Sequence, residues 1–217
     1  MVPDPALIPG AVSADDPRGT LDLWDYRRRV FENYRAVRAG GPGEQTWLAW
    51  REARQRLFAE HPQSAVEAEG RADWGGLAYF PHDPAWRFEV EVEPLAGEAV
   101  GIGHSGAGQT GFRTFGRARF EVPGREVVVT LYWLESYGGG IFLPFRDATS
   151  GHETYGGGRY LLDTVKGADL GHSGDRLVLD FNYAYHPSCV YSPRWSCPLA
   201  PRQNWLSVAV QAGERLP

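Results

Sequence analysis

The spacing of apolar residues changes near residue 75, and the change divides the chain into two parts. Before it, apolar residues recur at three- and four-residue steps, which is typical of amphipathic helices. One such segment covers 21–38 and is followed by Gly40-Gly41-Pro42, and a second covers 44–60 and is followed by His61-Pro62. The sequence therefore predicts two helices, with Thr20 as the N-cap of the first. Large aromatic residues in both stripes, including Trp24, Trp47 and Trp50, are expected to pack the pair onto the rest of the protein.

After residue 75 apolar and polar residues alternate, as they do in a strand with one solvated face. The first such segment covers 86–93. Further strand-like segments cover 111–122, 126–134, 140–145, 159–165, 176–185 and 205–211. Because no helical segment separates these strands, we predict a mainly β fold. We expect an antiparallel β-barrel or sandwich of about seven to eight strands, with the N-terminal pair of helices packed on it.

Length and composition fit this organisation. The chain has 217 residues, of which 42% are hydrophobic, so it has enough apolar residues for a core. We expect a disordered lead-in over 1–19, a helical extension over 20–62 and the β-barrel or sandwich domain over 63–217. Within that domain, 142–204 is the richest in polar motifs.

Charge narrows the range of partners. The net charge is −5, so no overall positive field attracts nucleic acid or an anionic membrane. The first twenty residues lack the pattern of a secretory signal, and no apolar run is long enough to span a membrane. We therefore expect a cytoplasmic protein without a nucleic-acid or membrane partner. The sequence leaves its oligomeric state open.

Two glycine-rich segments imitate known motifs without their structural context. Residues 101–106 match the dinucleotide fingerprint G-x-G-x-x-G, but a strand is predicted after them where the fingerprint needs a helix. Residues 103–107 and 171–174 resemble a nucleophile elbow, which needs a strand-to-helix turn in an α/β sheet. We interpret both as glycine turns, and expect neither a nucleotide cofactor nor a serine hydrolase.

Cys189 and Cys197 are the two cysteines of the chain. With His186 they would supply three zinc ligands, one short of a closed structural site, so we expect no metal. A disulfide is not expected in the cytoplasm, and we interpret the pair as buried free thiols. Cys197 as a nucleophile would need a nearby base such as His186 or His152.

The densest polar chemistry lies between Phe145 and Tyr160. This segment combines charged and hydroxyl side chains with three consecutive glycines, which permit a close approach of the backbone to a partner. In the predicted strand 176–185, alternation places Asp180 and Asn182 on one face. We expect these segments to line one pocket, whose ligand-binding residues are Arg146, Thr149, Tyr155, Arg159, Tyr160, Asp180, Asn182 and Tyr185.

Three functions are consistent with that region. The first is a pocket for a small polar or anionic metabolite at one end of the barrel, covered by the 184–204 connection. The second is a hydrolase-type enzyme with Glu153 or Asp147 as base, where a carboxylate paired with Arg159 would be the poorer base. The third is a structural or interaction protein, in which Arg159 pairs with a carboxylate to tie strand ends together.

The C-terminal motifs also resemble a known family. Residues 142–160, 179–182, 189–192, 197–198 and 212–214, with 61–64 and 76–81, resemble the prokaryotic family catalogued as domain of unknown function 1684. The resemblance spans roughly residues 21 to 214. It implies that 142–204 is the region of interest, but it brings no established activity. His186 stands where the family pattern has Asn, and Ala200 and Gln203 stand where Pro and Glu are expected.

Overall fold

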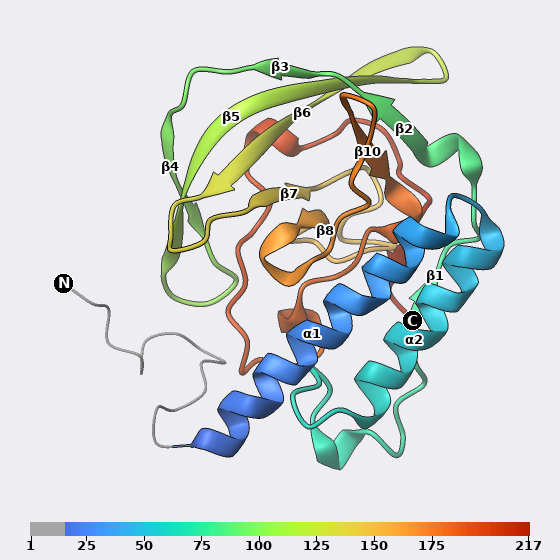
Figure 1. Ribbon diagram of the computed structural model, residues 1–217, viewed down its shortest axis with the longest axis vertical. Helices are drawn as coiled ribbons and strands as arrows, with labels where there is room; N and C mark the ends of the chain where they lie inside the picture. The colour runs from blue at the N-terminus through green and yellow to red at the C-terminus, as the bar shows by residue number, and fades with distance from the viewer. Residues whose placement is uncertain (1–15) are drawn as a thin grey trace.

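The computed structural model describes residues 16–217, and it begins with two helices that lie side by side (Figure 1). Helix α1 spans Pro17–Gly40 and helix α2 spans Glu44–Glu60. Asp16, and not Thr20, caps α1, because its carboxylate accepts a hydrogen bond from the Gly19 amide at 2.9 Å. Pro17 suits the first helical position, where no intrahelical N–H bond is needed. Most of the expected lead-in over 1–19 lies outside the described residues.

The rest of the described chain contains the strands, with short 3₁₀ helices and longer irregular segments between several of them (Figure 1). The strands are β1 (Ala78–Tyr79), β2 (Arg87–Val90), β3 (Val92–Pro94), β4 (Ala99–Gly103), β5 (Gln109–Val122), β6 (Arg125–Leu134), β7 (Ile141–Phe145), β8 (Arg159–Asp163), β9 (His172–Ser173), β10 (Arg176–Asp180) and β11 (Glu214–Arg215). Short 3₁₀ helices are η2 (Ala68–Gly70), η3 (Pro84–Trp86), η4 (Thr164–Lys166), η5 (Phe181–Tyr183), η6 (Ser188–Val190) and η7 (Arg202–Asn204).

All pairings between these strands are antiparallel. The main sheet has the order β3-β5-β6-β7-β8 with β4 also on β5, a second sheet has the order β2-β10-β9, and β1 pairs with β11. The sheets do not close into a barrel, and the sandwich-like, mainly β form of the prediction is confirmed. Strands β1, β9 and β11 were not predicted, because two residues carry no alternation, and β4 was missed because its Gly101 and Gly103 were interpreted as part of a turn.

The core lies between the main sheet and the β2-β10-β9 sheet. Phe181 is fully buried, and its ring lies near those of Trp86, Phe88, Phe120 and Phe145 at centroid distances of 5.2–6.1 Å. Burial of these aromatic rings is the dominant favourable contribution to packing the two sheets.

Both helices pack on the β body: Tyr34 and Val37 of α1 are buried in the same cluster as Trp47 and Trp50 of α2. Trp47 and Trp50 are buried, and the Trp47 indole N–H donates to the Asn182 carbonyl at 2.9 Å. The Trp50 ring lies 5.0 Å from that of Tyr183. Packing by aromatic residues is therefore confirmed for these two tryptophans. Trp24 does not share it, since 62% of the residue is exposed on α1.

Two predicted strands differ in the structure. Strand β10 ends at Asp180, because the Asp180 carboxylate accepts from the Asn182 amide and starts the 3₁₀ turn η5. Residues 205–211 form no strand; they run irregularly while Leu206 and Val210 fill the core.

Residues 101–106 enter the β4–β5 hairpin, as their interpretation as a glycine turn requires. Within the described chain, no helix has the length and apolar character needed to cross a membrane.

Candidate functional site

Arg159 opens β8 and is 1% exposed. Its terminal nitrogens donate four hydrogen bonds: to Asp147 Oδ2 at 3.0 Å and to the carbonyls of Val210, Ala212 and Glu214 at 2.8, 2.5 and 3.1 Å. These bonds join β8 to the turn after β7 and to the C-terminal segment. The guanidinium therefore serves as an internal cross-link, and its terminal nitrogens already have partners.

Asp147 is buried, and both of its carboxylate oxygens accept hydrogen bonds within the protein. Its Oδ1 accepts from the Thr149 amide at 3.2 Å, the Thr149 hydroxyl at 2.7 Å and the Ser150 hydroxyl at 3.2 Å. Its Oδ2 accepts from Arg159 and from the Val210 amide at 2.8 Å. The Thr149 hydroxyl also contacts that of Thr154 at 2.9 Å. This network closes the turn and leaves the carboxylate without a free position for a substrate proton.

Asp180 and Asn182 form a second, separate group. Asp180 Oδ1 accepts from the Asn182 amide and side chain at 3.0 and 2.8 Å. The Asn182 side chain forms two hydrogen bonds with the backbone of Asp83: its Oδ1 accepts from the Asp83 amide at 2.9 Å, and its Nδ2 donates to the Asp83 carbonyl at 2.8 Å. Burial raises the pKa of Asp180, against the hydrogen bonds from Asn182. Within residues 16–217, no hydrogen bond or ion pair joins Arg159 to this group.

The other predicted site residues are spread over the same region. Glu153 is exposed, with Gln211 Nε2 3.5 Å from its carboxylate. Arg146 stacks on the Trp205 ring at 4.3 Å. The Tyr160 hydroxyl donates to the Pro198 carbonyl at 2.6 Å, and the Tyr185 ring lies 4.9 Å from the Arg54 guanidinium. Tyr155 is half-buried beside Cys189. These contacts are mainly internal to the fold.

A buried ion pair that the sequence did not indicate links α2 to the C-terminal strand β11. Glu214 has no exposed surface, and its Oε2 accepts from Arg54 at 2.9 Å and from the His186 amide at 3.1 Å. Burial disfavours the charged form of Glu214, but Arg54 and His186 outweigh it and hold its pKa below the ordinary value.

This lowered pKa predicts an acid-sensitive contribution to stability. A carboxyl group whose pKa is lowered on folding stabilises the folded state at pH values above its pKa in the unfolded chain, about 4.3. This contribution is lost as the pH falls through the pKa of the folded state. The difference in unfolding free energy between wild type and Glu214→Gln should therefore shrink between pH 7 and pH 3 in urea titrations. A difference that stays constant over this range contradicts the assignment.

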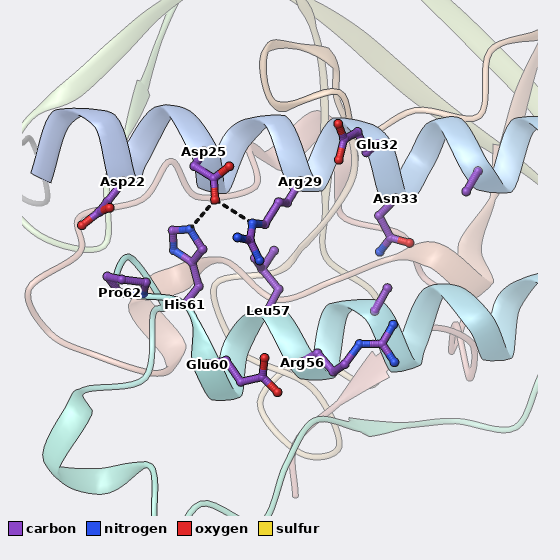
Figure 2. Close-up of a pocket in the computed structure, with 12 residues that line it drawn as sticks. Asp22, Asp25, Arg29, Glu32, Asn33, Arg56, Leu57, Glu60, His61 and Pro62 are labelled. Carbon is purple, nitrogen blue, oxygen red and sulfur yellow. Dashed lines mark hydrogen bonds and ion pairs between the residues drawn. The ribbon is translucent and has the colours of Figure 1, made fainter. Parts of the chain in front are cut away.

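One cavity, of about 670 Å³, opens between α1 and α2 (Figure 2). Asp25 is paired with two other residues of the lining, Arg29 at 2.6 Å and His61 at 3.3 Å, and also contacts Arg28 at 2.6 Å. The hydrogen bond from Arg28, opposed by burial and supported by Arg29 and His61, lowers the pKa of Asp25 to about 2. We interpret this cavity as a solvated groove between two helices.

A second groove, of about 480 Å³, lies where α2 meets the segment before β1. It is lined by Leu48, Arg51, Glu52, Gln55, Gly75, Gly76, Leu77 and Tyr79. The Arg51 guanidinium lies beside two nearly perpendicular aromatic rings, 4.6 Å from the centroid of Trp47 and 4.6 Å from that of Tyr79. Gln55 Oε1 accepts from the Leu77 amide at 2.9 Å, which fixes its side chain in the groove wall.

Arg51 is a cation without an acidic partner at this groove. Arg51 Nε and the Tyr79 hydroxyl are buried without a hydrogen-bond partner, and Arg51 forms no ion pair with any residue of the described chain. Sequence reasoning missed this arginine. The available signal was its position four residues after Trp47, which places the two side chains on one face of the helix.

Among residues 16–217, no group of three or more His, Cys, Asp or Glu side chains is arranged to hold a metal ion. Cys189 and Cys197 are free and half-buried, so they are more accessible than the predicted buried thiols. His186 does not act as a base for Cys197 in this arrangement, since its Nε2 accepts a hydrogen bond from the Tyr155 amide at 3.2 Å.

The fold and these sites define a mainly antiparallel β protein with an N-terminal helix pair. The chain belongs to the family described as "Protein of unknown function (DUF1684)", whose profile matches residues 72–215. It is similar to the solution NMR structure of an uncharacterised protein of Haloarcula marismortui, with 37% identity and a TM-score of 0.58. That match covers 79% of this chain and 93% of the other. Comparison with the curated proteins finds no match.

Proposed function

We propose that this protein binds a small anionic metabolite in the groove formed by α2 and the segment before β1. The observation that carries the proposal is Arg51, a cation held against two rings with no acidic partner among the described residues. Cation–π contacts with the two rings hold the guanidinium in place. Arginine in such a position recognises a carboxylate or phosphate through paired N–H groups.

The groove also has the size and mixed character of a small-molecule site. Its volume of about 480 Å³ falls in the range of ordinary ligand pockets, roughly 300–1,000 Å³. Gln55 adds a hydrogen-bonding group, and Leu48 and Leu77 add apolar surface. Glu52 lies at the groove but pairs with Arg56 at 2.5 Å, which reduces its repulsion of an anion.

Ligand binding and hydrolysis around Arg159 have weaker support than the pairing of Arg159 with a carboxylate, which is observed with Asp147. Binding there would require the guanidinium to give up internal partners, since its terminal nitrogens already donate four hydrogen bonds. A hydrolase with Asp147 as base would have to break a network of five hydrogen bonds. Glu153 is free of such bonds to Arg159, but it lies exposed on the surface.

The proposal predicts that anions stabilise the protein through Arg51. Melting temperature would be measured with inorganic phosphate, acetate and citrate at low millimolar concentration and constant ionic strength. A ligand at one hundred times its Kd stabilises the folded state by about 2.7 kcal/mol. We expect at least one anion to raise the melting temperature of wild type and to have no such effect on Arg51→Ala.

Arg176→Ala provides the matched control, because this exposed arginine lies on β10, away from the groove lining, and its loss removes the same charge. It should respond to the anions as wild type does. Equal responses of wild type and Arg51→Ala, or no response to any of the three anions, would count against the proposal.

A further inference from the structure

Two thiols and a phenol meet beside the tip of the β4–β5 hairpin. Cys189 lies in η6, and Cys197 lies further along the same connection; both are half-buried and therefore reachable from solvent. The Sγ atom of Cys189 is 3.9 Å from the Tyr155 hydroxyl oxygen. Cys197 lies near enough to Cys189 to lower the pKa of the Cys189 thiol. A nucleophilic cluster is thus present outside the Arg51 groove.

The hairpin tip holds Cys197 in place. The Ser105 amide donates to the Cys197 carbonyl at 2.9 Å, and the Cys197 amide donates to the Ser105 hydroxyl at 3.1 Å. Two residues later, the Leu199 amide donates to the Gly103 carbonyl at 2.9 Å. These bonds fix the backbone that carries the second thiol.

The buried polar network of the fold holds Tyr155 in place. Arg159 bonds to the Glu214 carbonyl, and the Glu214 carboxylate accepts from the His186 amide. His186 Nε2 in turn accepts from the Tyr155 amide at 3.2 Å. The internal cross-link at Arg159 therefore extends, residue by residue, to the side chain that touches Cys189.

These neighbours make the two thiols chemically different. The hydrogen bond from Cys197, opposed by burial and supported by Ser105 and Tyr155, lowers the pKa of Cys189 to about 6. The same shared proton, with burial, raises the pKa of Cys197. Burial and the neighbouring Cys189 raise the pKa of Tyr155 to about 12, so its hydroxyl remains a donor at neutral pH. Because the thiolate is the reactive form, Cys189 is the thiol prepared for attack.

We propose that Cys189 and Cys197 form a redox-active dithiol that reduces small disulfides, with Cys189 as the attacking thiol and Cys197 as the resolving thiol. The Tyr155 hydroxyl positions and stabilises the Cys189 sulfur. This activity is separate from anion binding at Arg51, and neither depends on the other.

The reaction balances as two thiol–disulfide exchanges. The Cys189 thiolate attacks one sulfur of the small disulfide and breaks its S–S bond. This forms a mixed disulfide between Cys189 and one half of the small molecule. The other half leaves as a thiolate and takes up the proton that Cys189 had released. Cys197 then loses its proton and attacks the Cys189 sulfur, which breaks the mixed disulfide and releases the second small thiolate, and that thiolate takes the proton. The protein dithiol loses two electrons, and the small disulfide gains them as two thiols.

Oxidised glutathione provides the test, with the product followed by intact-protein mass spectrometry. Reduced wild type should lose two hydrogens and keep no glutathione, because Cys197 resolves the mixed disulfide. Cys197→Ser should keep one glutathione, on Cys189. Cys189→Ser should react at about one tenth of the wild-type rate or slower, since its remaining thiol is largely protonated. A wild type that stays reduced or keeps its adduct, or two serine variants that react equally fast, overturns the proposal.

Tyrosine variants separate positioning from general damage to the fold. Tyr155→Phe should slow formation of the mixed disulfide, whereas Tyr137→Phe, which removes the hydroxyl of a fully exposed tyrosine, should match wild type. If a serine variant does not fold, the same question is tested by alkylating native wild-type protein with iodoacetamide. Peptide mapping should then show that Cys189 is modified about tenfold faster than Cys197. Equal rates there contradict the proposal as well.

Discussion

Replacing Arg159 with alanine is expected to lower the free energy of unfolding by about 3–5 kcal/mol, as removal of one partner from a buried ion pair does. The side chain is 1% exposed and donates to Asp147 and to three carbonyls of the C-terminal segment. Its loss leaves the Asp147 charge buried without its cationic partner and leaves buried carbonyls without donors. Urea unfolding monitored by tryptophan fluorescence measures the change.

Arg119→Ala is the matched control for this substitution. Arg119 pairs with Glu93 at 2.9 Å and with Glu126 at 3.0 Å, but all three side chains are solvent-exposed. Exposed pairs contribute little, so the expected loss is below about 1 kcal/mol. If Arg159→Ala and Arg119→Ala cost the same, Arg159 is not the cross-link described above.

Trp50→Ala is expected to lower the free energy of unfolding by about 3–5 kcal/mol, because it removes a large ring from the contact between α2 and the β body. Trp50 is 1% exposed, and its ring lies 5.0 Å from Tyr183, 5.8 Å from Tyr79 and 5.9 Å from Tyr34. Thermal and urea unfolding measure the loss, and faster proteolysis between α1 and α2 would locate it.

Trp24→Ala is the corresponding control on α1. The residue is 62% exposed, so the substitution removes the same side chain with little buried area. Its expected effect is within about 0.5 kcal/mol, as for surface substitutions in general. A Trp50 variant as stable as the Trp24 variant shows that the helix pair does not depend on this contact.

The two tryptophans also show how far the sequence predicts the fold. Periodicity predicted both helices and most of the longer strands, because alternation and three- to four-residue spacing are local properties. It assigned Trp24 and Trp50 the same role, although one is exposed and the other buried. Which apolar residue meets the β body depends on how α2 approaches Tyr183, and this is set by tertiary contacts.

The candidate site shows the same limit more clearly. The sequence identified Arg159, Asp147, Asp180 and Asn182 as polar residues of unusual density. It did not show that the first two pair with each other while the last two bond to one another at a strand end. The extension of alternation beyond Asp180 was wrong, because a side-chain cap converts the strand into a 3₁₀ turn.

Residues that the sequence passed over lie at sites formed only by folding. Arg51 was one polar residue among many on a helix, and its significance comes from Tyr79, which the fold brings against it. Cys189 and Cys197 were treated as buried, whereas the hairpin tip and Tyr155 hold them half-exposed. Such contacts between distant segments leave no periodic signal in a single sequence.

An NMR titration of isotopically labelled protein with inorganic phosphate tests most directly whether anions bind at Arg51 and not at Arg159. We predict that the Arg51 side-chain signal and the backbone amides of Gly76 and Leu77 shift in a saturable manner, while the Arg159 side-chain signal stays constant. Shifts centred on Arg159, Asp180 and Asn182, with the Arg51 groove unaffected, would contradict the account.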